Sequence, residues 1–278
     1  MIEIGVYNKL RILRETTVGL FLGDDEGESV LLPNKYCPKE FELDDEIEVF
    51  VYLDHEERKV ATNIAPKIQL NDFALLKVNA VTEVGAFMDW GLEKELLVPY
   101  SEQRMSMEEG RWYMVYLCLD NESERLFASN KIEKFLQNEV INVKEDDEVD
   151  IIIYRKTDLG YLCIINEEHK GLLYANEVFR ELNIGDKLTA FVKKVREDNK
   201  IDLSLQAKGF VQYNDANEKL VMEKLKENEG FLSLHDKSSP DEIYEQLGIS
   251  KKAFKKTIGT LYKQKAITLQ EDGIRVKN

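Results

Sequence analysis

Three stretches of the chain repeat one order of apolar and polar residues. Each begins with an apolar segment that contains a glycine between apolar neighbours, at Gly19, Gly85 and Gly160. A short apolar segment follows, then a polar turn, a long alternating segment, a charged turn and a last short segment. Alternation with a period of two is typical of strands buried on one face. The pattern predicts three repeats of five short strands.

The spacing inside the repeats is nearly constant. From the glycine to the end of the long alternating segment is 35 residues in the first two repeats (to Asp54 and Asp120) and 36 in the third (to Arg196). Five short strands with a glycine at which a coiled strand bends are typical of an OB barrel. We therefore expect a mainly β protein with some α structure. The predicted units are three five-stranded OB-fold barrels at 1–66, 67–132 and 145–208, with a linker at 133–144.

The last part of the chain has helical rather than strand periodicity. A helix is predicted at 215–228, and a second begins at the N-cap Ser239, continues through Pro240 and stops at Gly248. Ser250 caps a third helix that runs to Lys265, and a hairpin follows at 267–276. The core side of the third helix is expected to contain Phe254, Ile258, Leu261 and Tyr262. Three helices and a hairpin predict a winged helix at 209–278.

The charge distribution separates this last part from the barrels. The chain has a net charge of −15. Residues 1–214 hold 26 basic and 42 acidic residues, whereas 215–278 hold 12 and 11. Because nucleic acid attracts basic surfaces, this balance is the main argument against nucleic-acid binding by the barrels. This argument is strongest for residues 1–66, which hold 7 basic and 15 acidic residues.

Candidate chemistry is sparse. Cys37, Cys118 and Cys163 are far apart and form no metal-binding or disulfide pattern, and the three histidines stand alone. We find no phosphate-binding glycine loop and no catalytic triad, so we expect no enzyme, no cofactor and no metal. Neither a signal peptide nor a spanning segment is evident, which favours a cytoplasmic protein without membrane contact.

The third repeat resembles the S-one-type RNA-binding OB domain of the large ribosomal protein. The similar motifs are Gly171-Leu172-Leu173-Tyr174, Ile184-Gly185-Asp186-Lys187 and the ending at 201–205. The second repeat has diverged, with Pro99 where that family often has histidine, and the first matches least. Such barrels followed by a winged helix resemble the conserved virulence factor B family of bacteria. The resemblance implies RNA binding and regulation of gene expression, and no enzyme.

Candidate RNA contacts in the barrels are aromatic and basic. Tyr161, Tyr174 and Phe87 are placed to stack bases, although each is also a possible core residue. Trp90 is either a stacking residue at a rim or a cover of the barrel end. Basic candidates on or beside the late strands are Lys193, Lys200 and Arg125; a solvated face explains them equally well. Lys59 takes the place of Arg125 in the first repeat.

In the winged helix, Lys251, Lys252, Lys255 and Lys256 are spaced to lie on one side of the third helix, and Arg275 in the wing adds a further charge. A solvated helix face is the alternative. We predict a single-stranded RNA-binding protein that acts in post-transcriptional regulation, with affinity concentrated in the third barrel and winged helix. Alternatives are a DNA-binding regulator that acts through the winged helix, or a scaffold that binds a protein partner at the first barrel or winged helix. No dimerisation helix is evident, so a monomer is expected.

Overall fold

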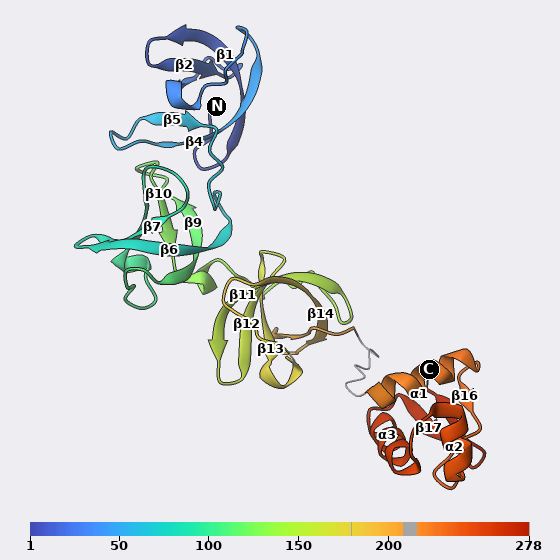
Figure 1. Ribbon diagram of the computed structural model, residues 1–278. Coiled ribbons are helices and arrows are strands. Elements are labelled where there is room, and N and C mark those ends of the chain that lie inside the picture. Colours follow the sequence, from blue (N-terminus) through green and yellow to red (C-terminus); the bar gives the residue numbers. More distant parts are fainter. Residues whose placement is uncertain (179, 208–215, 278) are drawn as a thin grey trace. The chain divides into compact units, whose positions relative to one another are not determined.

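The computed structural model describes residues 1–178, 180–207 and 216–277, and the chain divides into two compact units, 1–207 and 208–278 (Figure 1). The first unit contains the three barrels and the second the winged helix, so the predicted fold class is confirmed. In the described part of the chain, no helix is long and apolar enough to cross a membrane.

The first and third barrels are closed and share one strand order, in which the third and fifth strands run parallel and complete the barrel. The first consists of β1 (Tyr7–Thr16), β2 (Gly19–Gly23), β3 (Ser29–Pro33), β4 (Glu46–Leu53) and β5 (Lys59–Thr62). The third consists of β11 (Glu148–Thr157), β12 (Gly160–Ile165), β13 (His169–Tyr174), β14 (Lys187–Val195) and β15 (Ile201–Ser204).

The second barrel has the same strands in the sheet order β10-β9-β6-β7-β8, with β8 and β10 at its edges. Its strands are β6 (Phe73–Thr82), β7 (Gly85–Asp89), β8 (Leu96–Pro99), β9 (Trp112–Leu119) and β10 (Leu126–Ser129). A single 3-10 turn follows the third strand of each barrel, at η1 (Asn34–Tyr36), η2 (Tyr100–Glu102) and η4 (Ala175–Glu177).

The glycine at the start of the second strand has the same conformation in all three barrels. Gly19, Gly85 and Gly160 have φ of +148°, +147° and +148°. A Cβ atom there would lie 2.1–2.2 Å from the carbonyl oxygen of Leu32, Val98 or Leu173 on the paired strand. These glycines are therefore required both by their backbone angle and by the close approach of the next strand.

The barrels pack against one another through buried apolar side chains. Trp90 of the second barrel is 2% exposed and packs edge-on against Phe50 and Tyr52 of the first. The second and third barrels share a second buried cluster, to which Phe73 and Tyr154 belong. Trp90 is therefore a core residue between barrels and not a rim residue for stacking.

The segment predicted as a linker is folded onto the third barrel. After the 3-10 turn η3 (Ile132–Lys134), Ile141 and Val143 pack against the core of that barrel. His169, which is fully buried, has Nδ1 2.7 Å from the Gln137 carbonyl oxygen and Nε2 2.7 Å from Asn142 Oδ1. The segment's residues thus form part of the barrel's surface, a role that composition alone does not reveal.

The winged helix contains α1 (Ala216–Glu227), β16 (Phe231–Leu232), α2 (Pro240–Leu247), α3 (Lys251–Lys263), β17 (Ile267–Leu269) and β18 (Ile274–Val276). Asp215, where the first helix is predicted to begin, lies outside the described residues. Strand β16, which pairs with β18, was not predicted.

The predicted helix ends are present. Ser239 forms a capping box with Glu242, Gly248 ends α2 at φ +66°, and the Ser250 side chain accepts the backbone N–H of Ala253. The predicted core side of α3 is wrong at one position. Tyr262 is 54% exposed, and Thr257 takes the buried place instead.

We predict that Gly160→Ala unfolds the third barrel at a lower temperature than the wild type does. The added methyl group meets a carbonyl oxygen in a disfavoured backbone conformation, which costs about 3 kcal/mol or more. Gly259→Ala, in the interior of α3 with open space around its Cβ position, should instead stabilise its domain by roughly 0.5–1 kcal/mol. Scanning calorimetry of the full chain measures both, and a Gly160→Ala variant as stable as the wild type would contradict the assignment.

Candidate nucleic-acid interface

The outward face of the third barrel carries a groove of about 310 Å³ beside β13 and β15. We call it the third-barrel groove. Its lining residues are Asn138, Leu159, Leu162, Lys170, Gly171, Leu172, Tyr174, Arg196, Lys200, Ile201 and Asp202. Apolar strand residues form its floor, and basic and polar side chains stand around it. The groove thus offers apolar surface together with positive charge.

Tyr174, Arg196 and Asp202 form a connected group in this groove. The Arg196 guanidinium donates to both carboxylate oxygens of Asp202, at 2.8 Å each, and to the Tyr174 hydroxyl. The hydrogen bonds to Asp202 are the main cause that holds the pKa of Arg196 above its usual range, and the hydrogen bond to Tyr174 acts in the same direction. Because Asp202 is only 9% exposed, it fixes the guanidinium in place. The partly exposed Tyr174 ring is held by the same contacts.

Register explains why Tyr174 and not Tyr161 reaches the groove. Tyr161 lies opposite the buried Leu173, and both pack against the barrel core. Lys156 Nζ lies 5.7 Å from the centre of the Tyr161 ring. The next residue, Leu162, lies opposite Leu172 and lines the groove instead. The structure therefore supports the core alternative for Tyr161.

The two predicted lysines of this barrel lie in different places. Lys200 lines the third-barrel groove, is 67% exposed at its side chain and pairs with Asp198 at 2.6 Å. Lys193 is exposed on β14 and is not among the residues that line the groove. Arg196 was not among the predicted contacts. A signal was nevertheless visible, because this repeat has arginine where the other two repeats have Asp54 and Asp120.

The second barrel brings its two predicted residues together. Phe87 and Arg125 line one groove of about 440 Å³ against the first barrel. Three glutamates also line it, at positions 57, 93 and 95, and Arg125 is paired with Glu57. This aromatic and basic pair is thus surrounded by carboxylates, which disfavour an incoming phosphate.

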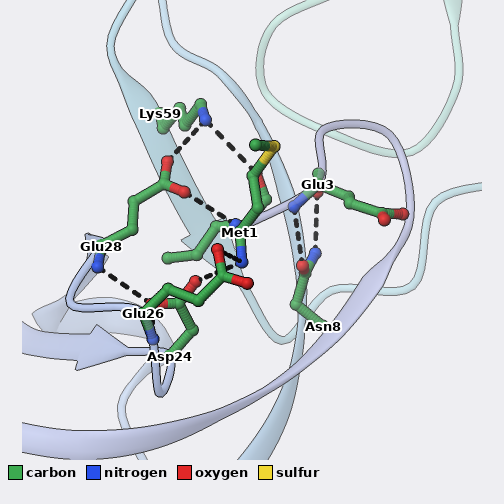
Figure 2. Close-up of polar contacts among 8 residues, drawn as sticks. Met1, Glu3, Asn8, Asp24, Glu26, Glu28 and Lys59 are labelled. Carbon is green, nitrogen blue, oxygen red and sulfur yellow. Dashed lines mark hydrogen bonds and ion pairs between the residues drawn. The ribbon is translucent and has the colours of Figure 1, made fainter.

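In the first barrel Lys59 forms an ion pair with a carboxylate of the same barrel (Figure 2). Its ammonium lies 2.6 Å from the Glu28 carboxylate and donates to the Ile2 carbonyl oxygen. Glu28 also accepts the Ile2 backbone N–H at 2.8 Å. The Lys59 side chain is only 25% exposed. Nearby, the exposed terminal ammonium of Met1 pairs with Asp24 and Glu26. The hydrogen bond with Asp24, and to a lesser extent that with Glu26, raises the pKa of this ammonium to about 10.

In the winged helix, α3 presents Lys252, Lys255 and Lys256 as exposed side chains. Lys251 is half-buried, and its ammonium donates to the Lys237 carbonyl oxygen at 3.4 Å. Arg275 in β18 is exposed, with its guanidinium 5.0 Å from the Phe231 ring centre. Lysines in the first turn of a helix oppose the helix dipole, and the first turn of α3 holds no acidic residue.

Helical spacing extends this basic face beyond the predicted residues. Tyr262 and Lys263 are exposed one to two turns after the lysines, at i+7 from Lys255 and Lys256. Gly259 lies between these two groups of exposed residues, and no atom outside its own stretch of helix backbone lies within 4 Å of its Cβ position. The helix backbone is therefore accessible there. A phosphate or base can approach the backbone closely at such a glycine. We refer to Lys252, Lys255, Lys256, Tyr262 and Lys263 as the α3 basic face.

Two other classes of site are tested by the geometry. Among the described residues, no group of three or more His, Cys, Asp or Glu side chains could hold a metal ion. Cys118 and Cys163 are buried, and burial raises the pKa of the Cys118 thiol to about 11 and that of Cys163 to about 12. These thiols are therefore protonated core groups at neutral pH.

Two domain families match the sequence. A CvfB-like winged helix domain matches residues 219–276, and an S1 domain, the S-one type, matches residues 4–63. The S1 match falls on the first barrel, the repeat whose short motifs are least similar to those of the S-one-type domain. The first barrel thus keeps the overall pattern of the domain while lacking the motif residues that are expected to contact RNA.

Relatives cover most of the chain. Uncharacterized protein YitL of Bacillus subtilis is 30% identical over 275 residues, 95% of this chain and 90% of the relative. Conserved virulence factor B of Staphylococcus epidermidis is 28% identical over 253 residues, 88% of this chain and 85% of the relative. A crystal structure of a multidomain protein with nucleic acid binding domains from Streptococcus pneumoniae is 24% identical, with a TM-score of 0.49 and coverage of 99% and 98%.

Three barrels with S1-type topology followed by a CvfB-like winged helix define the class of this protein. The chain belongs to the conserved virulence factor B family.

We predict that the Glu28–Lys59 pair stabilises the first barrel above about pH 4.5 and ceases to do so in acid. Lys59, and then the Ile2 N–H, lower the pKa of Glu28. Stability from a lowered pKa is present above the unfolded value and is lost as the pH falls through the folded value. Glu28→Gln should cost less than about 1 kcal/mol at pH 7 and progressively less below pH 4. Urea unfolding at both pH values measures this difference; a cost independent of pH would contradict it.

Proposed function

We propose that the chain is a cytoplasmic binding protein for single-stranded RNA that acts in post-transcriptional regulation and is not an enzyme. The observation that carries this proposal is the third-barrel groove, where an oriented tyrosine ring lies beside a fixed guanidinium. A base stacks on such a ring, and the adjacent cations attract its phosphate. Single strands fit because their bases are free to turn toward the protein.

The α3 basic face supports the proposal from the second unit. Its Lys252 lies in the first turn of α3, where a cation is unfavourable unless an anion compensates it. Phosphate oxygens supply that compensation. We therefore assign RNA contact to Tyr174, Arg196 and Lys200 in the third barrel and to the α3 basic face with Arg275. Lys251, being half-buried, contributes less than its neighbours.

The first two barrels are assigned a lesser part in RNA binding. Lys59 is paired with Glu28 and its side chain is only 25% exposed. Arg125 is paired with Glu57 in a groove that two further glutamates line, and these carboxylates repel phosphate. Pro33 and Pro99 take the place of Tyr174, so no aromatic ring is offered at that position. The acidic first barrel is the better candidate for contact with a protein partner.

The first test changes Tyr174 to alanine in the full chain. Loss of one stacked base should weaken binding of a short single-stranded RNA by about 1–3 kcal/mol, with little change in salt dependence. Tyr174→Phe keeps the ring and should retain most of the affinity. Tyr100→Ala, which removes an aromatic side chain 51% exposed on the second barrel, serves as the matched control. Equal affinities for Tyr174→Ala and Tyr100→Ala would contradict the assignment.

The second test removes Lys252, Lys255 and Lys256 together by alanine substitution. Each phosphate contact on a single strand contributes about −0.7 to the slope of log K against log salt. Loss of two or three contacts should therefore flatten the slope by roughly 1.5–2. Lys219→Ala with Lys226→Ala, exposed lysines of α1, is the control. An unchanged slope would identify a solvated face, and tighter binding to duplex DNA than to RNA would favour a DNA-binding regulator.

A further inference from the structure

A groove of about 400 Å³ lies between the second and third barrels, separate from the third-barrel groove. We call it the junction groove. Its floor belongs to the buried cluster that joins the two barrels, to which Met114, Ile132 and Tyr154 contribute. Side chains from both barrels and from the segment between them form its walls. The groove is large enough for one nucleoside with its phosphate.

An exposed tryptophan stands at this groove. Trp112 lies in β9, lines the groove and is 55% exposed. The chain has two tryptophans, and the other, Trp90, is 2% exposed between the first and second barrels. A large exposed ring beside a concave surface is accessible to a flat ligand. Tryptophan is well suited to stack on a base.

The groove is basic although the chain is acidic. Its lining residues include four cations, Arg104, Lys131, Lys134 and Arg155, and one carboxylate, Glu133. Lys134 is paired with Glu102, which lies outside the lining, at 3.0 Å. The Arg104 guanidinium lies 3.5 Å from the Met105 sulfur. The local balance therefore favours an anionic ligand.

Glu133 occupies the place where an anion is expected. Its carboxylate is held by the Arg155 guanidinium and lies 3.5 Å from the Lys170 ammonium. Lys170 also lines the third-barrel groove, so this ion-pair cluster connects the two grooves. Arginine and lysine around one carboxylate form a geometry that a phosphate also satisfies. A strand in one groove is thus adjacent to the other.

Buried polar atoms at the groove lack partners. Tyr154 is 7% exposed, and within the described residues its hydroxyl has no hydrogen-bond partner; the same holds for Asn130 Oδ1 and Arg155 Nε. Buried polar groups are ordinarily paired, so these three atoms are available to hydrogen-bond a ligand or water at the groove. The Arg155 guanidinium lies 5.8 Å from the centre of the Tyr154 ring.

We propose that the junction groove holds one nucleotide of the bound single-stranded RNA, with its base on Trp112 and its phosphate replacing Glu133 between Arg155 and Lys170. This inference rests on the proposed function and extends it, because the strand then continues from the third-barrel groove across the junction of two barrels. Tyr154 and Asn130 supply a hydroxyl donor and an amide acceptor to the edge of the base.

The first experiment uses tryptophan fluorescence of the full chain. A six-nucleotide single-stranded uridine RNA should quench the exposed Trp112 on binding, whereas the buried Trp90 changes little. Trp112→Phe should abolish the quenching, and Trp112→Ala should weaken binding about five-fold or more. Tyr100→Ala should bind as the wild type does. Absence of quenching at saturating RNA, or wild-type affinity for Trp112→Ala, overturns the inference.

The second experiment removes the competing carboxylate. Glu133→Gln should bind the same RNA several-fold more tightly, because the phosphate no longer has to displace a carboxylate from Arg155 and Lys170. Glu139→Gln, an exposed residue of the same segment outside the groove, should leave affinity unchanged. Weaker or unchanged binding of a folded Glu133→Gln variant overturns the phosphate position, since the ion pair is then purely structural.

Failure of this inference and failure of the proposed function give different results. If Tyr174→Ala weakens RNA binding but Trp112→Ala and Glu133→Gln match their controls, the third-barrel groove binds RNA and the junction groove does not. If Trp112 is quenched while Tyr174→Ala has no effect, the reverse holds. Uridine monophosphate distinguishes the source of the nucleotide. Saturation by it at micromolar concentration, with no competition by the RNA, overturns the assignment to an RNA strand.

Discussion

The close approach of two strands at the bend glycine is the backbone constraint that all three barrels share. At Gly160 the paired strand passes so near that a Cβ would lie 2.2 Å from the Leu173 carbonyl oxygen. The residue directly opposite this glycine is Tyr174, and in the other barrels it is Pro33 or Pro99. Since cross-strand partners share a face, the glycine places no side chain beside that residue. One backbone constraint thus creates the same position three times.

What occupies this position distinguishes the barrels. In the third, a tyrosine is held by Arg196, which is itself held by Asp202. In the first two, proline offers neither an aromatic ring nor a hydroxyl, and the nearby cations are paired with Glu28 or Glu57. Repetition of a fold therefore need not repeat its chemistry. The second barrel differs again, because its side chains line a groove at its junction with the third barrel.

Local signals made most of the fold predictable. Caps at Ser239, Gly248 and Ser250 act within a few residues, and strand alternation is read directly from the chain. The sequence left alternatives open where the answer depends on strand pairing. Tyr161 follows the glycine and was a candidate both for RNA contact and for the core; it shares a face with the buried Leu173, and a shift of one residue reverses the face. Trp112 and Arg155 could not be found, because their groove exists only when two barrels pack.

An acidic protein can bind RNA because charge acts locally. At physiological salt, fields from exposed charges decay over about 8 Å, so carboxylates on distant hairpins have little effect at a groove. Nearby carboxylates matter far more. Glu28, Glu57, Glu133 and Asp202 each hold a cation that is in or near a candidate surface. Asp202 is buried and orients its arginine, whereas Glu133 is 42% exposed and can be displaced. Burial of the carboxylate, rather than net charge, therefore decides whether an ion pair supports a binding site or competes with the ligand for it.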